Sequence, residues 1–206
     1  MAYDCISFAT EGLKVQLKSA VFIDRDGVLN KLVFNPSTQA FEAPHKSQDL
    51  EIIATSFEGL RKLQEKGYEL FVVSNQPDFA LGKAGLDDIK EVADRVKREF
   101  DRHSILIREY YYCYHHPQSL IAEYNIQCGC RKPGPDFILK AAKDHDLDLS
   151  RSWMIGDQDS DVECGKNAGL KTVLIMNENS AKKRGLSKPT LTALDLKDSA
   201  DKIQNF

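Results

Sequence analysis

The chain has 206 residues, of which 42% are apolar and 29% charged, and its formal net charge is −3 at pH 7. These values are typical of one globular domain that can bury a sizeable core. The acidic balance argues against a protein built around nucleic acid or an anionic membrane, because either partner would favour an excess of lysine and arginine. No apolar run is long enough to span a membrane, and residues 1–18 lack the pattern of a signal peptide.

The cysteines indicate a reducing compartment. There are 5 of them, and three lie within residues 113–130. An odd count with one such cluster is unlike the disulfide framework of a small secreted protein. We therefore expect a cytoplasmic protein, and we expect it to be a monomer without a nucleic-acid or membrane partner.

Short apolar segments alternate along the chain with helical segments. The predicted strands are 19–24, 68–75, 104–112, 152–157 and 170–176. The predicted helices are 55–67, 87–103, 135–145 and 159–169. Thr55 and Glu58 have capping-box spacing, which places them at the start of the first helix. This alternation predicts an α/β fold, a Rossmann-like three-layer sandwich with a mainly parallel central sheet.

The spacing of the elements leaves no room for a cap domain. We expect residues 1–206 to form a single domain with 1–18 as an N-terminal extension, where the alternation over 13–18 could add an edge strand. The intervals from residue 24 to 74 and from 74 to 132 are too short for an independent cap. Loops must then shape the site.

Three segments are candidates for those loops: residues 31–49, 77–85 and 113–133. The polar segment 177–189 is interpreted differently, as a solvated surface loop. Its basic residues Lys182, Lys183 and Arg184 are accordingly not expected to hold phosphate.

Carboxylates follow two of the predicted strands. Asp24 and Asp26 come directly after the first strand, and Asp157 and Asp161 follow the fourth. Ligand sites of parallel sheets lie at the carboxyl ends of the strands, so these groups should meet. Carboxylates this close repel each other unless a cation lies between them, and an open set of oxygen ligands suits Mg²⁺. We predict a magnesium site here, which Asp159 could also join.

Four short motifs occur in order around these carboxylates: DRDG at 24–27, VVSN at 72–75, RKP at 131–133 and GDQDSD at 156–161. As an ordered set they resemble the four signature motifs of the haloacid dehalogenase superfamily of phosphatases. The resemblance implies an enzyme that hydrolyses phosphate esters.

The resemblance also implies roles for individual residues. Asp24 would be the nucleophile that takes the phosphoryl group as an aspartyl phosphate, and Asp26 would act as general acid and then as base. Ser74 would donate a hydrogen bond to the phosphoryl group, and Lys132 would neutralise its charge. These residue types suit phosphoryl transfer, which needs charge neutralisation and in-line placement.

The implied Mg²⁺ ligands are Asp24, the backbone carbonyl of Asp26, and Asp157, with Asp161 completing or supporting the cluster. The implied substrate contacts are Asn75, which follows Ser74, and Arg131, which precedes Lys132.

The segment 113–130 has the spacing C-x-H-x₁₂-C-x-C. Its candidate ligands are Cys113, His115, Cys128 and Cys130. Three thiolates and one imidazole match a closed structural zinc set, although His116 is an alternative ligand on spacing alone. The run CYHHP…CGCRKP is similar to the zinc loop of bacterial D-glycero-D-manno-heptose 1,7-bisphosphate phosphatases, which a histidinol-phosphate phosphatase domain shares. That resemblance selects His115.

The chain departs from this family's pattern in two basic positions. Leu81 stands where the family has an arginine, and Gln158 stands where it has a lysine that faces phosphate. The glycine-containing substrate loop after the first motif is not recognisable in residues 31–41. These departures shift the expectation from a bisphosphate toward a monophosphate or another small phosphate ester.

We therefore expect an Mg²⁺-dependent phosphatase with a structural zinc loop that acts on a phosphorylated heptose, a bisphosphate or a monophosphate, for surface-polysaccharide precursors. Histidinol phosphate is the alternative substrate. Two other classes stay open: a non-catalytic module that accepts phosphate on an aspartate, and a zinc-dependent binding module.

Overall fold

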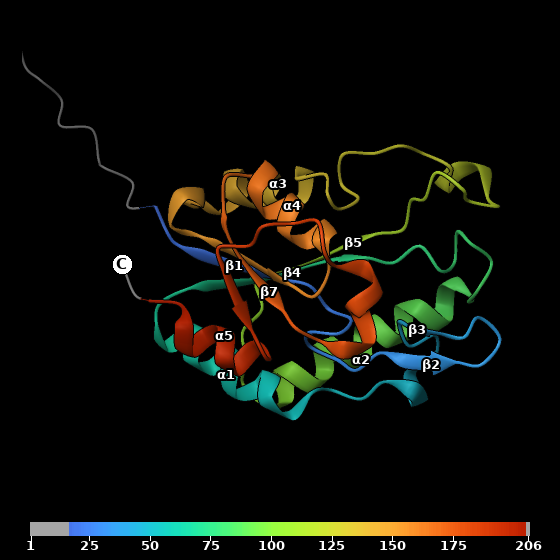
Figure 1. The fold of residues 1–206 in the computed structure, drawn as a ribbon, viewed down its shortest axis with the longest axis horizontal. Coiled ribbons are helices and arrows are strands. Elements are labelled where there is room, and N and C mark those ends of the chain that lie inside the picture. Colours follow the sequence, from blue (N-terminus) through green and yellow to red (C-terminus); the bar gives the residue numbers. More distant parts are fainter. Residues whose placement is uncertain (1–16, 205–206) are drawn as a thin grey trace, which may run out of the picture.

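The computed structural model describes residues 17–204 of the chain. A 6-stranded sheet forms its centre, in the order β5-β4-β1-β6-β7-β8, and every neighbouring pair in it is parallel (Figure 1). Its strands are β1 (Ala20–Ile23), β4 (Glu69–Asn75), β5 (Glu109–Cys113), β6 (Trp153–Gly156), β7 (Lys171–Ile175) and β8 (Leu191–Ala193). A separate antiparallel hairpin consists of β2 (Val33–Asn35) and β3 (Ala40–Glu42).

Helices cover both faces of the sheet and complete three layers (Figure 1). The α-helices are α1 (Ala54–Glu65), α2 (Leu86–Arg102), α3 (Asp136–His145), α4 (Asp159–Asn167) and α5 (Leu196–Lys202). The 3₁₀ turns are η1 (Ser47–Asp49), η2 (Ala122–Tyr124), η3 (Leu149–Arg151) and η4 (Glu178–Lys183). Apolar residues of α1, α2 and α5 share one core cluster, and those of α3 and α4 share the other. The predicted fold class is confirmed.

The central strand β1 shows why the sheet needs both helical layers. Val21 and Ile23 belong to the core beneath α1, α2 and α5, whereas Ala20 and Phe22 belong to the core beneath α3 and α4. Successive side chains of a strand point to opposite faces, so a strand covered on both faces is apolar throughout. All four residues are fully buried. The next residue along the chain, Asp24, therefore emerges where the buried strand ends.

The beginning of α1 differs from the prediction. The helix starts at Ala54, after Ile53 as its N-cap, and no side chain caps it, so Thr55 is already inside the helix. Contacts with the loop after β1 fix its entry instead. The Ile53 N–H donates to the Leu29 carbonyl, and the Ser56 hydroxyl donates to the Val28 carbonyl. The capping-box prediction is wrong because tertiary hydrogen bonds replace the local one.

Several short elements were not predicted. The strand predicted over 104–112 is β5, which begins at Glu109 because its pairing with β4 begins there. The hairpin strands β2 and β3, the edge strand β8 and the helix α5 are each at most 7 residues long, too short for a clear period. The segments between β1 and α1 hold only this hairpin and η1, so no cap domain is inserted there.

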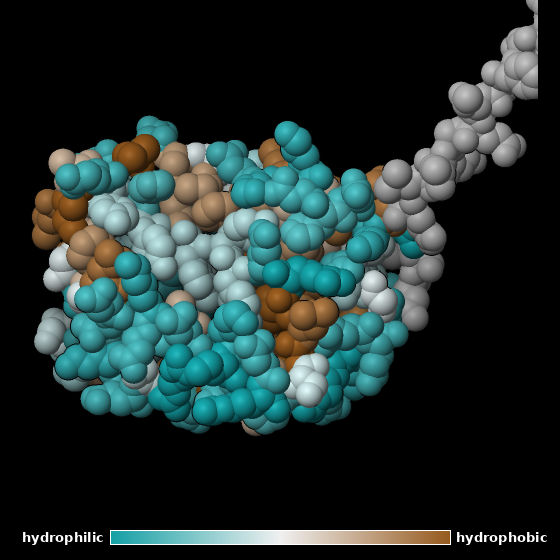
Figure 2. Space-filling view, turned by 180° about the vertical axis from the view of Figure 1, so that it is seen from behind, coloured by the Kyte–Doolittle hydropathy of each residue, from teal (hydrophilic) through white to brown (hydrophobic). Residues whose placement is uncertain are grey.

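The start of the described region bears on one further prediction. The proposed edge strand over 13–18 lies outside the described residues apart from Leu17 and Lys18. Lys18 bridges to Leu147 in parallel. No helix within residues 17–204 is long and apolar enough to cross a membrane. The face shown in Figure 2 is mostly hydrophilic, and its apolar side chains form small separate groups.

Candidate active site

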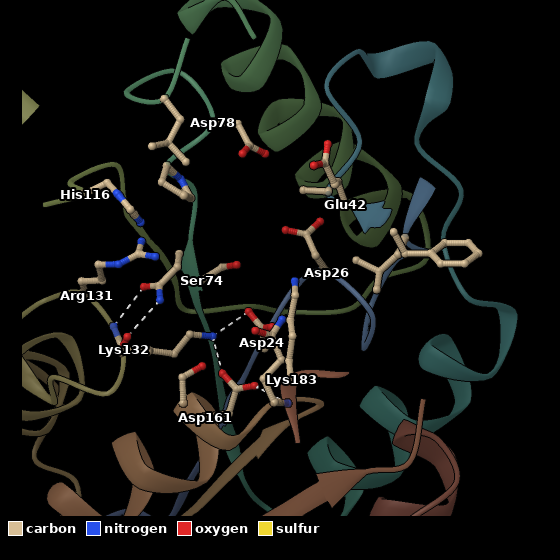
Figure 3. A pocket seen from close by; sticks show the side chains of 18 of the residues that line it. Asp24, Asp26, Glu42, Ser74, Asp78, His116, Arg131, Lys132, Asp161 and Lys183 are labelled. Carbon is tan, nitrogen blue, oxygen red and sulfur yellow. Dashed lines mark hydrogen bonds and ion pairs between the residues drawn. The ribbon is translucent and has the colours of Figure 1, made fainter. Parts of the chain in front are cut away.

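A pocket of about 490 Å³ lies at the carboxyl edge of the sheet. Its floor includes Asp24, Ser74, Lys132 and Asp161, and its walls come from the three loop segments that the sequence predicted (Figure 3). Residues 40–43 of the hairpin form one wall, residues 77–83 another, and His116 with Arg131 a third. The loops therefore occupy the place that a cap domain would take.

Lys132 lies at the centre of the floor. Its ammonium is 2.7 Å from an oxygen of Asp24 and 2.6 Å from an oxygen of Asp161, and it donates to the Val73 carbonyl at 2.9 Å. Burial alone would lower the pKa of Lys132, but Asp161 and Asp24 outweigh it and raise that pKa. Lys132 therefore stays charged beside the predicted nucleophile.

Asp157 completes an acidic cluster with Asp24 and Asp161. One carboxylate oxygen from each lies within 4.8 Å of the others, and all three residues are buried. Within residues 17–204, neither carboxylate oxygen of Asp157 has a hydrogen-bond partner. Burial, followed by the charges of Asp24 and Asp161, raises the pKa of Asp157 to about 8. Unpartnered buried oxygens and mutual repulsion fit a site for a divalent cation, in particular Mg²⁺.

The turn after β1 leaves space for this cluster. Gly27 has φ of +88°, and a Cβ added there would lie 2.2 Å from Oδ2 of Asp157. Glycine is therefore required twice, for the left-handed backbone and for the close approach. The expectation that Asp159 joins the cluster is wrong. Its carboxylate instead accepts hydrogen bonds from residues 185–187, which anchor the loop after η4.

The unpartnered oxygens of Asp157 lead to a stability prediction. Without Mg²⁺ at pH 7, the Asp157→Asn variant is expected to be more stable than the wild type by about 1–3 kcal/mol, because folding keeps the Asp157 carboxyl protonated well above its usual pKa, whereas an amide has no proton to take up. Urea denaturation in EDTA measures this difference. Added Mg²⁺ should stabilise the wild type and leave the variant nearly unchanged. An equal response of both proteins to Mg²⁺ would contradict a cation site at Asp157.

Three residues hold the Asp26 carboxylate, and sequence reasoning missed all of them. The fully buried Arg25 donates to both carboxylate oxygens at 3.0–3.1 Å, and Gln76 donates to Oδ2 at 2.5 Å. Arg25 also donates to the Gln76 side chain at 2.8 Å. Asn30 supplies a further donor to Oδ1 at 3.0 Å. Arg25 lies within the motif DRDG and Gln76 directly follows VVSN, so both were visible beside the motifs. Their role could not be inferred without knowing that the ends of these two strands are in contact.

The predicted substrate contacts Asn75 and Arg131 both line the pocket. The Asn75 side chain also holds the backbone of Lys132. Its amide donates to the Lys132 carbonyl at 3.1 Å, and its oxygen accepts from the Lys132 N–H at 3.0 Å. Arg131 donates to the His115 carbonyl at 3.3 Å. Their proposed contacts with substrate stay predictions.

The structure brings the four predicted zinc ligands together. The ligand atoms of Cys113, His115, Cys128 and Cys130 all lie within 4.8 Å of one another. The three sulfurs are 3.0–3.6 Å apart, and the Cys130 sulfur is 3.5 Å from His115 Nδ1. His116 instead accepts from the Gln118 N–H and lines the pocket. This donor set fits a tetrahedral zinc ion.

The surroundings of Cys128 favour its thiolate form. Burial alone would raise the pKa of Cys128, but hydrogen bonds, from Cys130 and the Arg131 backbone first, lower it to about 7. A thiolate is the form that ligates metal. The pKa of Cys130, in contrast, is raised by burial and by its neighbours Cys128 and Cys113. Three adjacent thiols cannot all ionise without a cation between them, which is the condition that zinc satisfies.

A set of ion pairs, here called the rim clamp, ties the hairpin to the loop after β4. Its members are Glu42, His45, Asp78 and Lys83. Lys83 pairs with Glu42 at 2.8 Å, and His45 pairs with Asp78 at 3.1 Å. Burial alone would raise the pKa of Glu42, but hydrogen bonds from Lys83 and Asn35 lower it to about 2. The hydrogen bond to Asp78 raises the pKa of His45. The Glu42–Lys83 ion pair and the hydrogen bond between His45 and Asp78 therefore both stabilise the pocket rim.

Known proteins are similar to this chain over most of its length. A family model described as HAD-hydrolase-like matches residues 129–199. The D-glycero-alpha-D-manno-heptose-1,7-bisphosphate 7-phosphatase of Photorhabdus laumondii is 32% identical over 149 residues, which are 72% of this chain and 77% of that enzyme. The beta-anomer 7-phosphatase of Helicobacter pylori J99 is 32% identical over 171 residues, or 82% and 88% of the two chains.

The chain belongs to the heptose-bisphosphate phosphatase family of the haloacid dehalogenase superfamily. It is accordingly a phosphatase. Solved structures of the family agree in fold. The D,D-heptose 1,7-bisphosphate phosphatase of B. bronchiseptica, complexed with magnesium and phosphate, has a TM-score of 0.72 at 22% identity and covers 89% of this chain and 96% of its own. The enzyme from Burkholderia thailandensis gives 0.61 at 19% identity, with coverage of 89% and 96%.

The loop 177–189 is largely exposed, as the sequence predicted, but one of its lysines also reaches the pocket. Leu81 and Gln158, the two uncharged replacements, both line the pocket. Lys183 also lines it, although the sequence placed this residue on a solvated surface. The position of Lys183 at the pocket could not be predicted from the local sequence, because it depends on how η4 folds back toward the end of β1.

Proposed function

We propose that this phosphatase hydrolyses a phosphorylated heptose, a bisphosphate or a monophosphate, through an aspartyl-phosphate intermediate with Mg²⁺ bound. The observation that carries the proposal is the buried Asp24 carboxylate, which lies 2.7 Å from the Lys132 ammonium and beside Asp157 and Asp161. Relatives that share 32% identity are named as heptose-1,7-bisphosphate 7-phosphatases, which supports the sugar. The step would serve surface-polysaccharide precursor synthesis.

In the proposed first step an Asp24 oxygen attacks phosphorus. The bond to the ester oxygen breaks, and Asp26 gives that oxygen its proton, so the sugar leaves as an alcohol. In the second step Asp26 takes a proton from water, the water oxygen attacks the aspartyl phosphate, and Asp24 is regenerated with inorganic phosphate. This division turns one difficult hydrolysis into two displacements.

The surrounding residues neutralise the charge of the phosphoryl group and orient the reacting carboxylates. Lys132 supplies positive charge next to Asp24, and the Ser74 hydroxyl is a donor at the pocket floor. Arg25 and Gln76 hold the Asp26 carboxylate in place. Asp24, Asp157 and the backbone carbonyl of Asp26 would hold Mg²⁺, supported by Asp161. When bound, that ion would neutralise charge on the transferring phosphoryl group.

Histidinol phosphate is the second candidate substrate. The pocket wall carries two carboxylates, Glu42 and Asp78, that could accept hydrogen bonds from an ammonium group as well as from sugar hydroxyls. Both remain paired within the rim clamp, so neither requires a cationic substrate.

The test is a comparison of kcat/KM for heptose 1,7-bisphosphate, heptose 7-phosphate and histidinol phosphate, each with Mg²⁺ and with EDTA. We expect one of the heptose phosphates to be hydrolysed with the highest kcat/KM and only when Mg²⁺ is present. The highest kcat/KM for histidinol phosphate would overturn the substrate assignment. Phosphorylation of the protein without turnover would overturn the enzymatic mechanism.

A further inference from the structure

The cations nearest the nucleophile are already committed. An ammonium has three donors, and Lys132 uses them on Asp24, Asp161 and the Val73 carbonyl. The Arg25 guanidinium is engaged by Asp26 and Gln76 behind the pocket floor. A transferring phosphoryl group brings further negative charge to this place, and the proposed Mg²⁺ would neutralise part of it, so a further cation that faces the pocket would strengthen binding.

Lys183 is a cation on this pocket whose charge is free. Its side chain lines the pocket together with Asp24 and Gln158 (Figure 3). Among the residues that the structure describes, its ammonium has no ion-pair or hydrogen-bond partner. Lys83, in contrast, is paired with Glu42. The neighbour Lys182 is exposed and does not line the pocket.

The turn η4 is held against the site, which fixes where Lys183 can reach. The Asn177 amide donates to the Gly27 carbonyl at 2.9 Å, and the buried Ser180 hydroxyl donates to the Asp157 carbonyl at 3.2 Å. Arg184 donates to the Ser180 hydroxyl and to the Asn177 carbonyl, so it fastens the turn. The two residues at the end of the turn thus have different roles, because Arg184 anchors it and Lys183 faces the pocket.

We propose that Lys183 binds the phosphoryl group of the substrate at Asp24, as an addition to Lys132. The role rests on the proposed function. It places a positive charge beside Gln158, whose own side chain is neutral. A lysine suits this role because it acts as a mobile point charge on a long stem.

The test compares three variants, Lys183→Ala, Lys183→Arg and the matched control Lys182→Ala. Two readouts are used with Mg²⁺ present: kcat/KM for p-nitrophenyl phosphate, and the Kd of inorganic phosphate by calorimetry. For Lys183→Ala we expect kcat/KM to fall, and the Kd of phosphate to rise, by about tenfold. Lys183→Arg should recover most of both, and Lys182→Ala should stay within about twofold of the wild type.

The outcomes distinguish a failure of the role of Lys183 from a failure of the proposed function. Equal phosphate Kd values for Lys183→Ala and Lys182→Ala would overturn the role of Lys183. A wild type that binds phosphate but shows no turnover would overturn the proposed function, while the phosphate Kd values would still report on Lys183. Because Lys183 is exposed and unpaired within residues 17–204, its loss should not unfold the chain. Thermal denaturation verifies this.

Discussion

Turnover is expected to fall by at least about 10⁴-fold when Asp24 is replaced by Asn, because the amide cannot attack phosphorus. The fold should survive this change. Lys132 keeps Asp161 at 2.6 Å and the Val73 carbonyl at 2.9 Å, so its buried ammonium is not left without partners. The variant therefore separates the chemistry of Asp24 from the integrity of the pocket.

The measurement is steady-state release of phosphate with Mg²⁺, together with trapping of the phosphorylated protein by acid quench. Asp159→Asn is the matched control. It changes an aspartate of the fourth motif, GDQDSD, whose carboxylate accepts hydrogen bonds from residues 185–187 and does not line the pocket, and its turnover should remain within about twofold. Turnover that persists in Asp24→Asn would assign the nucleophile elsewhere.

The double substitution Cys128→Ser, Cys130→Ser is expected to remove zinc, from about one ion per chain to none. It should also lower kcat/KM about 100-fold, because Arg131 and Lys132 directly follow Cys130 and a small displacement of a catalytic cation is costly. The nucleophile is unchanged, so the slow remaining turnover should still pass through a phosphorylated Asp24. Elemental analysis and acid-quench trapping measure the two effects.

Matched variants separate the zinc ligands from their neighbours. His115→Ala should lose zinc, whereas His116→Ala should keep it, since His116 accepts from the Gln118 N–H outside the cluster. Cys164→Ala should also keep zinc, because the Cys164 thiol is buried elsewhere and donates to the Gly134 carbonyl. Full zinc occupancy in the double variant would refute the assigned ligand set.

The carboxylates of the site could be predicted from sequence because backbone topology alone brings them together. Asp24 and Asp157 each follow the end of a buried parallel strand, and β1 pairs directly with β6. Similar reasoning applies to the four zinc ligands, which lie at the end of β5 and on the loop that follows it. Chemistry of this kind depends on where the parallel strands end and on short spacing between ligands, and both can be read along the chain.

Residues whose role depends on side-chain packing were not predictable in this way. Arg25 becomes buried only because Asp26 and Gln76 meet it from two strand ends. Lys183 reaches the pocket only because Asn177 and Ser180 fasten its turn to the ends of β1 and β6. Each needs contacts between residues far apart in the chain. Arg25 was therefore not singled out, and the pattern around Lys183 indicated a solvated surface loop.

The rim clamp has a consequence for how water is kept from the reaction. Glu42 with Lys83 and Asp78 with His45 brace the entrance, and no cap domain in residues 17–204 closes over it. Enzymes that close a lid exclude solvent by moving protein over the substrate. Here the leaving group of the substrate must itself exclude water. A bulky leaving group fills the entrance and shields the phosphoryl group from solvent, whereas a small one leaves that group hydrated. Discrimination between bulky and small substrates should therefore appear in kcat more than in KM.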